Sequence, residues 1–317
     1  MTTATRRTSE AVDDTIPRSA DPRPREQSRA RYPDTTGFIE RDGVRVFYEV
    51  YGTGEPTILL LPTWSIIHSR FWKAQIPYLA RWYRVVTFDG RGNGRSDRPQ
   101  TVEAYTERQF AADAVAVMDA TATDRAVIAG LSMGAQRGLL LASDHPERVA
   151  GAVFIGPALA LDSVVRGGTQ DDFLDVRDTD DGWAKYNAHY WRRSYRDFLE
   201  FFFANVLTEP HSTKPTEDAV GWGLETDPET LILTQLAKGI GDRDEILARA
   251  ARVRCPVLVI HGSDDAIRPH RHGEELARAT GGRLLTIEGG GHLPNARDPI
   301  NVNLAIREFV DSLGTRT

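Results

Sequence analysis

Cysteine is nearly absent from this chain, since Cys255 is the only one among 317 residues. A single cysteine excludes an intramolecular disulfide framework and suits a protein of a reducing compartment. No apolar run approaches the roughly 18 residues that a membrane-spanning helix requires. The net charge of −6 disfavours nucleic acid or an anionic membrane as a main partner. Cys255 stands directly before Pro256 at the start of an apolar stretch, so we expect it to fill the core.

Apolar residues are also scarce at the amino-terminal end, from residue 1 to residue 35. This stretch is rich in Thr, Arg, Asp, Ser and Pro, a composition that is typical of disordered tails. The pair Arg6-Arg7 resembles the start of a twin-arginine export signal, but no apolar segment follows it. We therefore predict a cytoplasmic protein with a disordered tail over 1–35.

From residue 36 on, apolar stretches of strand length alternate with stretches of helical spacing. A hairpin is predicted over 38–51 around the turn signal Asp42-Gly43. Continuous apolar strands separated by helices indicate a mostly parallel sheet covered by helices on both faces. The further strands are expected at 57–61, 84–88, 126–129, 149–155, 256–260 and 283–287, and helices at 71–81, at 106–120, after 132 to about 143, at 272–279 and at 298–313.

The alternation stops between 157 and 249, where aspartates cluster and many aromatic residues follow without a clear strand. We predict that this segment is a helical insert that caps the sheet. It divides the α/β core into residues 36–156 and 250–317. The aromatic side chains of the insert could pack within it and against the core, or a few of them could line a substrate pocket.

The run GLSMG at 130–134 follows the apolar stretch 126–129 and is expected to form a sharp turn from strand to helix. Such a turn raises a serine hydroxyl above the sheet edge and directs helix N-terminal N–H groups toward the space in front of it. A serine hydroxyl is a weak nucleophile, so it needs a neighbouring base and a site for the developing anion. The pattern makes Ser132 a candidate nucleophile.

Two later strand ends carry the residue types that a serine nucleophile requires. Asp264 and Asp265 follow one predicted strand, and His292 follows the last one. The carboxyl ends of the strands in an open parallel sheet share one edge, so these groups can meet Ser132 there. His292 is then the candidate base, and an aspartate is the group that orients it.

In these motifs and their order, the chain resembles the α/β-hydrolase superfamily, in its serine-nucleophile, esterase- and lipase-like branch. The resemblance covers about 37–156 and 250–317. It rests on GLSMG at 130–134, GSDD at 262–265 with Pro269 four residues on, GGH at 290–292 and the loop DGRGNGRS at 89–96.

The resemblance implies a role for each candidate. Ser132 attacks an acyl carbon, His292 takes its proton and delivers it to the leaving group, and Asp265 holds the imidazole. Asp265 is preferred because members of the family place the acid four residues before the proline. Asp264 is the second candidate for the acid, and Asp162, after the preceding strand, is the third.

The same resemblance places the anion site at the N–H of Met133 and at an N–H of the loop after Leu61. Most of the family has His-Gly in that loop, whereas this chain has Pro62-Thr63, which puts Trp64 at the second donor. A bulky indole at this position would also narrow the acyl pocket.

Other histidines have structural interpretations that compete with a role in the site. His261 ends a predicted strand and is expected to be a structural hydrogen-bonding group. Ser65 and His68 lie in the loop that carries Trp64, so contact with substrate is as compatible with their position as a structural role. The polar residues of 264–272 lack the spacing of a metal site, so no metal is expected.

These residues favour hydrolysis of an ester-type, small-molecule acyl substrate through an acyl-serine intermediate, with no cofactor. C–C bond hydrolases, acyltransferases and cofactor-free haloperoxidase-like enzymes share the same triad and are alternatives. A small-molecule receptor on a hydrolase fold is the alternative from a different class.

Overall fold

The strands of the computed structural model form one mixed sheet. The model describes residues 29–162 and 170–314, and the sheet has eight strands in these ranges. They are β1 Thr35–Arg41, β2 Val44–Tyr51, β3 Thr57–Leu60, β4 Arg84–Phe88, β5 Ala126–Leu131, β6 Val149–Ile155, β7 Val257–Gly262 and β8 Arg283–Ile287. The strand order is β1-β2-β4-β3-β5-β6-β7-β8. Pairs β1–β2 and β2–β4 are antiparallel and all other pairs are parallel, which confirms the predicted mostly parallel sheet.

The predicted hairpin and strands agree with the structure to within two residues at each end, except at the start of the hairpin. Asp42 and Gly43 form its two-residue turn, with φ of 54° and 74°. Both angles lie in the left-handed region that such a turn requires and that glycine and aspartate tolerate. The hairpin strand β1 begins at Thr35, three residues earlier than predicted.

The predicted helix over 71–81 is wrong. The structure has a short 3₁₀ turn, Ser69–Trp72, and then a four-residue helix, α1 Ile76–Leu79. Pro77 explains the break, because proline has no N–H to donate to the carbonyl of Lys73 and its ring would collide with the preceding turn. At the start of α1 the same proline is tolerated, since the first N–H groups of a helix have no partner within it.

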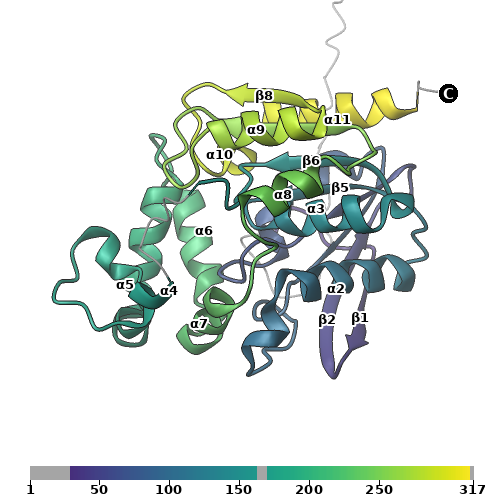
Figure 1. Ribbon diagram of the computed structural model, residues 1–317. Coiled ribbons are helices and arrows are strands. Elements are labelled where there is room, and N and C mark those ends of the chain that lie inside the picture. The colour runs from purple at the N-terminus through teal and green to yellow at the C-terminus, as the bar shows by residue number, and fades with distance from the viewer. Residues whose placement is uncertain (1–28, 163–169, 315–317) are drawn as a thin grey trace, which may run out of the picture.

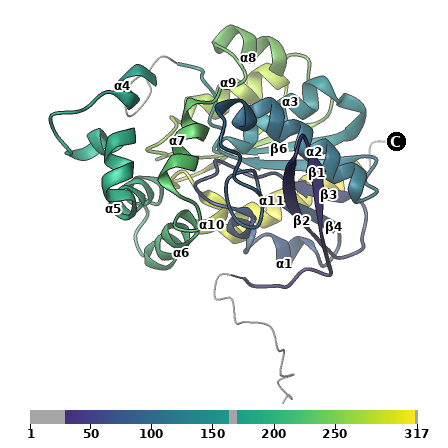
Figure 2. The ribbon, with the colours of Figure 1, turned by 90° about the horizontal axis from the view of Figure 1, so that it is seen from below.

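Helices cover both faces of the sheet, as predicted, and each face has its own apolar core (Figure 2). Successive strand residues alternate between the two cores: Ile58 and Leu60 face one, Leu59 and Leu61 the other. On one side lie α2 Glu107–Ala120, α3 Gly134–Asp144, α8 Arg243–Ala250 and α9 Arg271–Thr280; on the other lie α1, α10 Pro294–Arg297 and α11 Pro299–Leu313.

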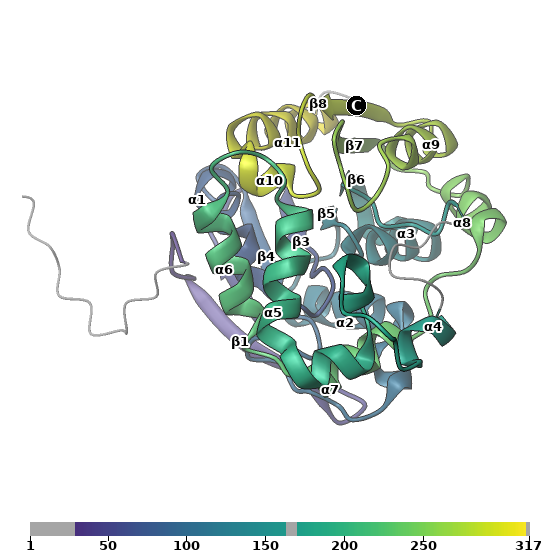
Figure 3. The ribbon, with the colours of Figure 1, turned by 90° about the vertical axis from the view of Figure 1, so that its left-hand side faces the viewer.

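The predicted insert is helical, and the described residues of 157–249 contain no strand. Its helices are α4 Gln170–Leu174, α5 Ala188–Val206, α6 Thr213–Gly223, α7 Pro228–Leu236 and α8. In Figures 1 and 3, α5, α6 and α7 lie over one set of strand ends of the sheet. Apolar residues of α5 and α6 belong to the same buried cluster as one face of the sheet, so the insert packs on the core. In contrast, α8 lies beside α3 and α9.

The predicted disordered tail falls mostly outside the described residues. The part that is described, 29–34, contacts the start of the sheet: the Arg29 guanidinium donates to Glu49 Oε2 at 3.1 Å and to Tyr51 Oη at 2.8 Å. Within the described residues, we find no helix with the length and apolar character that crossing a membrane requires.

Candidate active site

Ser132 lies in the turn between β5 and α3 and has a φ of 53°, in the left-handed region. Its N–H donates to Ile155 O at 2.9 Å, which fixes the turn to the neighbouring strand β6. The flanking glycines are required by close backbone contacts: a Cβ on Gly130 would lie 2.3 Å from Gly134 O, and one on Gly134 would lie 2.9 Å from Pro62 O. The turn therefore holds Ser132 half-buried above the strand ends.

His292 follows β8 and reaches Ser132 across the strand ends. Its Nε2 lies 2.9 Å from Ser132 Oγ, and its ring is buried. The His292 backbone N–H donates to Val206 O of the insert at 3.3 Å. Gly156, at the end of β6, has a φ of 47°, and a Cβ there would lie 2.9 Å from His292 O. The glycine thus permits the close approach that brings the imidazole to the serine.

Asp265 lies behind His292 in the loop after β7. Its Oδ2 is 2.7 Å from His292 Nδ1 and 3.0 Å from His261 Nε2. Its Oδ1 accepts the N–H groups of Ile267 and Arg268, each at 2.8 Å. Burial alone would raise the pKa of this carboxyl, but the charge on His292 and the N–H donors outweigh it and hold the pKa well below its usual range. Asp265 is therefore a carboxylate throughout the pH range in which histidine titrates.

The structure brings together Ser132, His292 and Asp265, and it places the two other candidate acids elsewhere. Asp264 is exposed, and its Oδ1 accepts a hydrogen bond from Ser263 Oγ at 2.8 Å. Asp162 pairs with Arg271 and lies 2.9 Å from His272 Nε2.

The two predicted anion-site residues come from two different loops at the strand ends, the turn after β5 and the loop after β3. Met133 follows Ser132 directly as the N-terminal cap of α3 and is half-buried. Trp64 belongs to the loop after β3, and its indole points into the insert, among the rings of Tyr186, Trp191 and Phe202 at centroid distances of 6.1, 5.9 and 5.4 Å. The indole is thus part of the contact between insert and core.

Arg137 on α3 fixes the loop that carries Trp64, and the sequence gives no signal for this role. Its guanidinium is buried, donates to Pro62 O at 2.9 Å and to Thr63 O at 2.5 Å, and pairs with Glu107 at 2.9 Å. The C=O and N–H of a trans peptide point in opposite directions. By holding the Thr63 carbonyl, Arg137 therefore also sets the direction of the Trp64 N–H.

The indole N–H of Trp64 donates to Thr234 Oγ1 of α7 at 2.8 Å, in a buried position. Replacing Thr234 by valine keeps the shape of the side chain but leaves this donor unpaired. We expect Thr234→Val to lower the free energy of unfolding by about 1–3 kcal/mol, as measured by urea denaturation.

Thr121→Val is the matched control for this prediction. Thr234 donates its own hydroxyl to Leu231 O at 2.7 Å, and the buried Thr121 likewise donates to Val117 O at 2.8 Å. Another partner of the Thr121 hydroxyl is the hydroxyl of Thr123 at 3.0 Å, and no indole depends on it. An equal loss of stability in both variants would contradict a specific contribution of the bond between Trp64 and Thr234.

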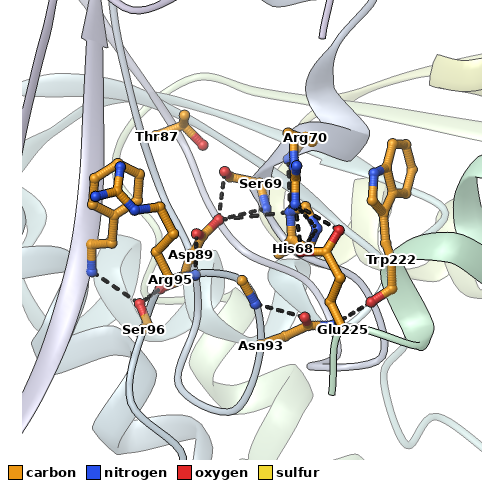
Figure 4. A network of polar contacts seen from close by, with 12 residues as sticks. His68, Ser69, Arg70, Thr87, Asp89, Asn93, Arg95, Ser96, Trp222 and Glu225 are labelled. Atoms are coloured by element: carbon orange, nitrogen blue, oxygen red, sulfur yellow. Dashed lines mark hydrogen bonds and ion pairs between the residues drawn. The ribbon is translucent and has the colours of Figure 1, made fainter. Parts of the chain in front are cut away.

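Ser65 and His68 lie in a polar network that joins the loop after β3 to the loop after β4 and to the insert. Figure 4 shows His68, Asn93, Trp222 and Glu225 of this network. Ser65 Oγ donates to Arg91 O at 2.7 Å, and Asn93 Nδ2 donates to Ser65 O at 2.9 Å and to Trp222 O at 3.1 Å. His68 is buried, with its Nε2 3.3 Å from a Glu225 carboxylate oxygen. These contacts favour the structural role over contact with substrate.

The carboxylate of Asp89 holds together the loop that follows β4. Its Oδ1 accepts the N–H and the hydroxyl of Ser69 at 3.1 and 2.6 Å, and its Oδ2 accepts the N–H of Arg95 at 2.9 Å (Figure 4).

In the part of the chain that the structure describes, no three His, Cys, Asp or Glu side chains are grouped to hold a metal ion.

Comparison with known proteins agrees with this architecture. Residues 56–299 match the family model described as the alpha/beta hydrolase fold. The AB hydrolase superfamily protein YisY of Bacillus subtilis is 27% identical, over 85% of this chain and 96% of its own. The esterase RhEst1 of Rhodococcus sp. ECU1013 superposes with a TM-score of 0.70 at 26% identity, over 87% of this chain and 98% of its own.

A bromoperoxidase of Bacillus anthracis has the same fold, with a TM-score of 0.72 at 22% identity, over 87% of this chain and 100% of its own. The matched region spans the turn at Ser132, the loop of Asp265 and the loop of His292. The chain is a member of the α/β-hydrolase family.

Proposed function

We propose that this protein is a serine hydrolase that cleaves an ester-type acyl substrate through an acyl-enzyme on Ser132. The observation that carries the proposal is the unbroken chain of contacts from Ser132 Oγ to His292 Nε2 at 2.9 Å and from His292 Nδ1 to Asp265 Oδ2 at 2.7 Å. The likeness to an esterase at 26% identity supports the same reaction.

The geometry supports a two-step mechanism. Ser132 Oγ attacks the acyl carbon while His292 Nε2 takes the hydroxyl proton, and the carbonyl oxygen of the substrate becomes an oxyanion. The oxyanion collapses, the bond to the alcohol breaks, and His292 returns the proton to the leaving alkoxide. A water molecule, deprotonated by His292, then attacks the acyl carbon. The bond from that carbon to Ser132 Oγ breaks, His292 returns the proton to Oγ, and the acid is released. The second step restores the enzyme, so no cofactor is consumed.

Asp265 contributes by accepting a hydrogen bond from the Nδ1–H of His292, which leaves Nε2 free to act as a base and stabilises the imidazolium that forms. The oxyanion requires N–H donors near Ser132, and those of Met133 and Trp64 are the proposed pair. The position of Met133 at the start of α3 adds the positive end of the helix to this site.

A fluorophosphonate probe tests this proposal, because it phosphonylates only a serine that is activated as a nucleophile. We expect the folded wild-type protein to be labelled, the label to map to the peptide that contains Ser132, and labelling to be lost in Ser132→Ala. Turnover of p-nitrophenyl esters of varied acyl length then measures the hydrolysis itself. A folded protein that neither labels nor turns over esters would favour a small-molecule receptor instead.

A further inference from the structure

The carboxylate of Asp265 contacts a second histidine besides His292. His261 is on β7 and is fully buried, with its Nε2 3.0 Å from Asp265 Oδ2 and 3.1 Å from Arg268 O. Because His292 Nδ1 lies 2.7 Å from the same Oδ2, two imidazoles share one carboxylate oxygen. The mechanism proposed above uses only one of them.

The surroundings of His261 fix its protonation. Its Nε2 faces two acceptors, a carboxylate and a carbonyl, so the proton must be on this nitrogen. Its Nδ1 is buried with no hydrogen-bond partner among the described residues. A Cβ on Gly273 of α9 would lie 2.5 Å from this Nδ1, so the helix backbone closes that side of the ring. A proton on Nδ1 would be an unpaired buried donor, so the contacts of His261 favour donation through Nε2–H.

We propose that His261 is a positioning residue that acts through Asp265: it holds the carboxylate in the plane of His292 and limits how strongly that carboxylate raises the basicity of His292. The proposal rests on the proposed function, because it assigns His292 the role of the base. A carboxylate that accepts one more N–H interacts less strongly with each of its other donors, because its negative charge is shared among more hydrogen bonds. His261 also closes the acid loop, since it donates to Arg268 O while Arg268 N–H donates to Asp265.

Several charged and titratable side chains lie on the elements packed against this pair. Asp265 and Arg268 belong to the acid loop itself. From the start of α9, the ring of His270 lies with its centroid 5.5 Å from that of His261, and its Nδ1 is 3.5 Å from Glu274. On the side of His292, Glu209 of the insert accepts the N–H of Gly291 at 2.8 Å. Of these side chains, His261 contacts only the carboxylate of Asp265 through a hydrogen bond.

Removing the Nε2–H donor of His261 should change the kinetics in two ways. Asp265 would interact more strongly with the imidazolium of His292, so the acid limb of kcat/KM would move to higher pH by about half a unit or more. Loss of one restraint on the carboxylate would also lower kcat at the plateau by about tenfold, with little change in KM.

The experiment compares three replacements of His261 in the full chain. Asparagine is too short to reach Asp265, and phenylalanine fills the space without a donor; both should shift the acid limb and lower kcat. Glutamine can place an amide N–H where His261 Nε2 lies, so His261→Gln should restore the wild-type limb. If His261→Phe fails to fold, the comparison of His261→Asn with His261→Gln still tests the proposal.

His272→Phe is the matched control. His272 is equally buried, has an unpartnered Nδ1, and contacts a carboxylate, but that carboxylate is Asp162. We expect His272→Phe to change stability without moving the acid limb. The positioning role is overturned if the limb in His261→Asn stays within 0.2 units of the wild type, or if it moves equally in His261→Gln or His272→Phe.

Failure of this proposal can be distinguished from failure of the proposed function. If the wild-type protein is not labelled at Ser132 by a fluorophosphonate, the proposed function fails and the positioning role fails with it. If the wild-type protein is labelled and turns over esters, but all His261 variants match it in kcat and in the acid limb, only the positioning role is overturned.

Discussion

Ser132→Ala should lower kcat for ester hydrolysis by about 10⁵-fold, because it removes the atom that becomes acylated and leaves only the binding and anion-site contributions. KM should change little, since the serine hydroxyl contributes to the reacting geometry more than to binding. The measurement is steady-state kinetics on a p-nitrophenyl ester, with active-site titration to exclude traces of wild-type enzyme. A variant that retained a tenth of the wild-type kcat would contradict the role of Ser132.

Ser132→Gly separates the chemistry from the backbone strain at the same position. Its kcat should be as low as that of Ser132→Ala, because both variants lack the hydroxyl. The φ of 53° is unfavourable for alanine and serine but free for glycine. We therefore expect Ser132→Gly to be more stable than Ser132→Ala by about 1 kcal/mol in urea denaturation. Equal stability would mean that the turn stores no strain at this residue.

Most of the sheet could be predicted from the sequence because its central strands are buried on both faces. Strands such as 149–155 are nearly continuous apolar runs bounded by turn residues, and the structure gives them these same bounds. The apolar spacing over 71–81 favours a helix, but Pro77 interrupts that helix, so the prediction from spacing is wrong. Spacing reports which side of a segment is buried, whereas a proline removes one specific hydrogen bond.

The three residues of the candidate triad could be predicted because each one follows a strand of a parallel sheet, and those strand ends share an edge. The contacts that support the triad could not be predicted from the sequence. Arg137 reaches two carbonyls of a loop more than seventy residues earlier, and nothing in its helix distinguishes it from an exposed arginine. His261 was expected to be structural from its place on a strand, but its partner Asp265 depends on how the acid loop folds back.

The preference for Asp265 over Asp264 comes from the family resemblance, in which the acid lies four residues before the proline, and the contacts of the two residues supply a physical reason for it. Asp265 is buried and accepts four N–H groups, whereas Asp264 is exposed and accepts one hydroxyl. Only the buried carboxylate lies within hydrogen-bond distance of His292. The exposed neighbour therefore provides an internal control that differs by one position.

Asp265→Asn should lower kcat by about 10³–10⁴-fold, whereas Asp264→Asn should stay within about twofold of the wild type. An asparagine at 265 presents one oxygen and one NH₂ group to a pocket in which both positions face donors. Whichever way the amide turns, its NH₂ group opposes either the imidazoles or the backbone N–H groups of Ile267 and Arg268. If the NH₂ group faces His292, it favours the wrong tautomer of the base. At Asp264, an amide oxygen can still accept the hydroxyl of Ser263.

The same pair of variants should differ in acid stability, and the sign follows from the lowered pKa of Asp265. A carboxyl whose pKa is lower in the folded than in the unfolded protein stabilises the fold above the unfolded pKa of about 4. That stabilisation is lost as the pH falls from there toward the folded pKa. Asp265→Asn should therefore be less stable than the wild type at pH 7, with a difference that narrows below about pH 4. Asp264→Asn should follow the wild-type curve, and a parallel curve for Asp265→Asn would show that Asp265 is not the carboxylate that His292 holds ionised.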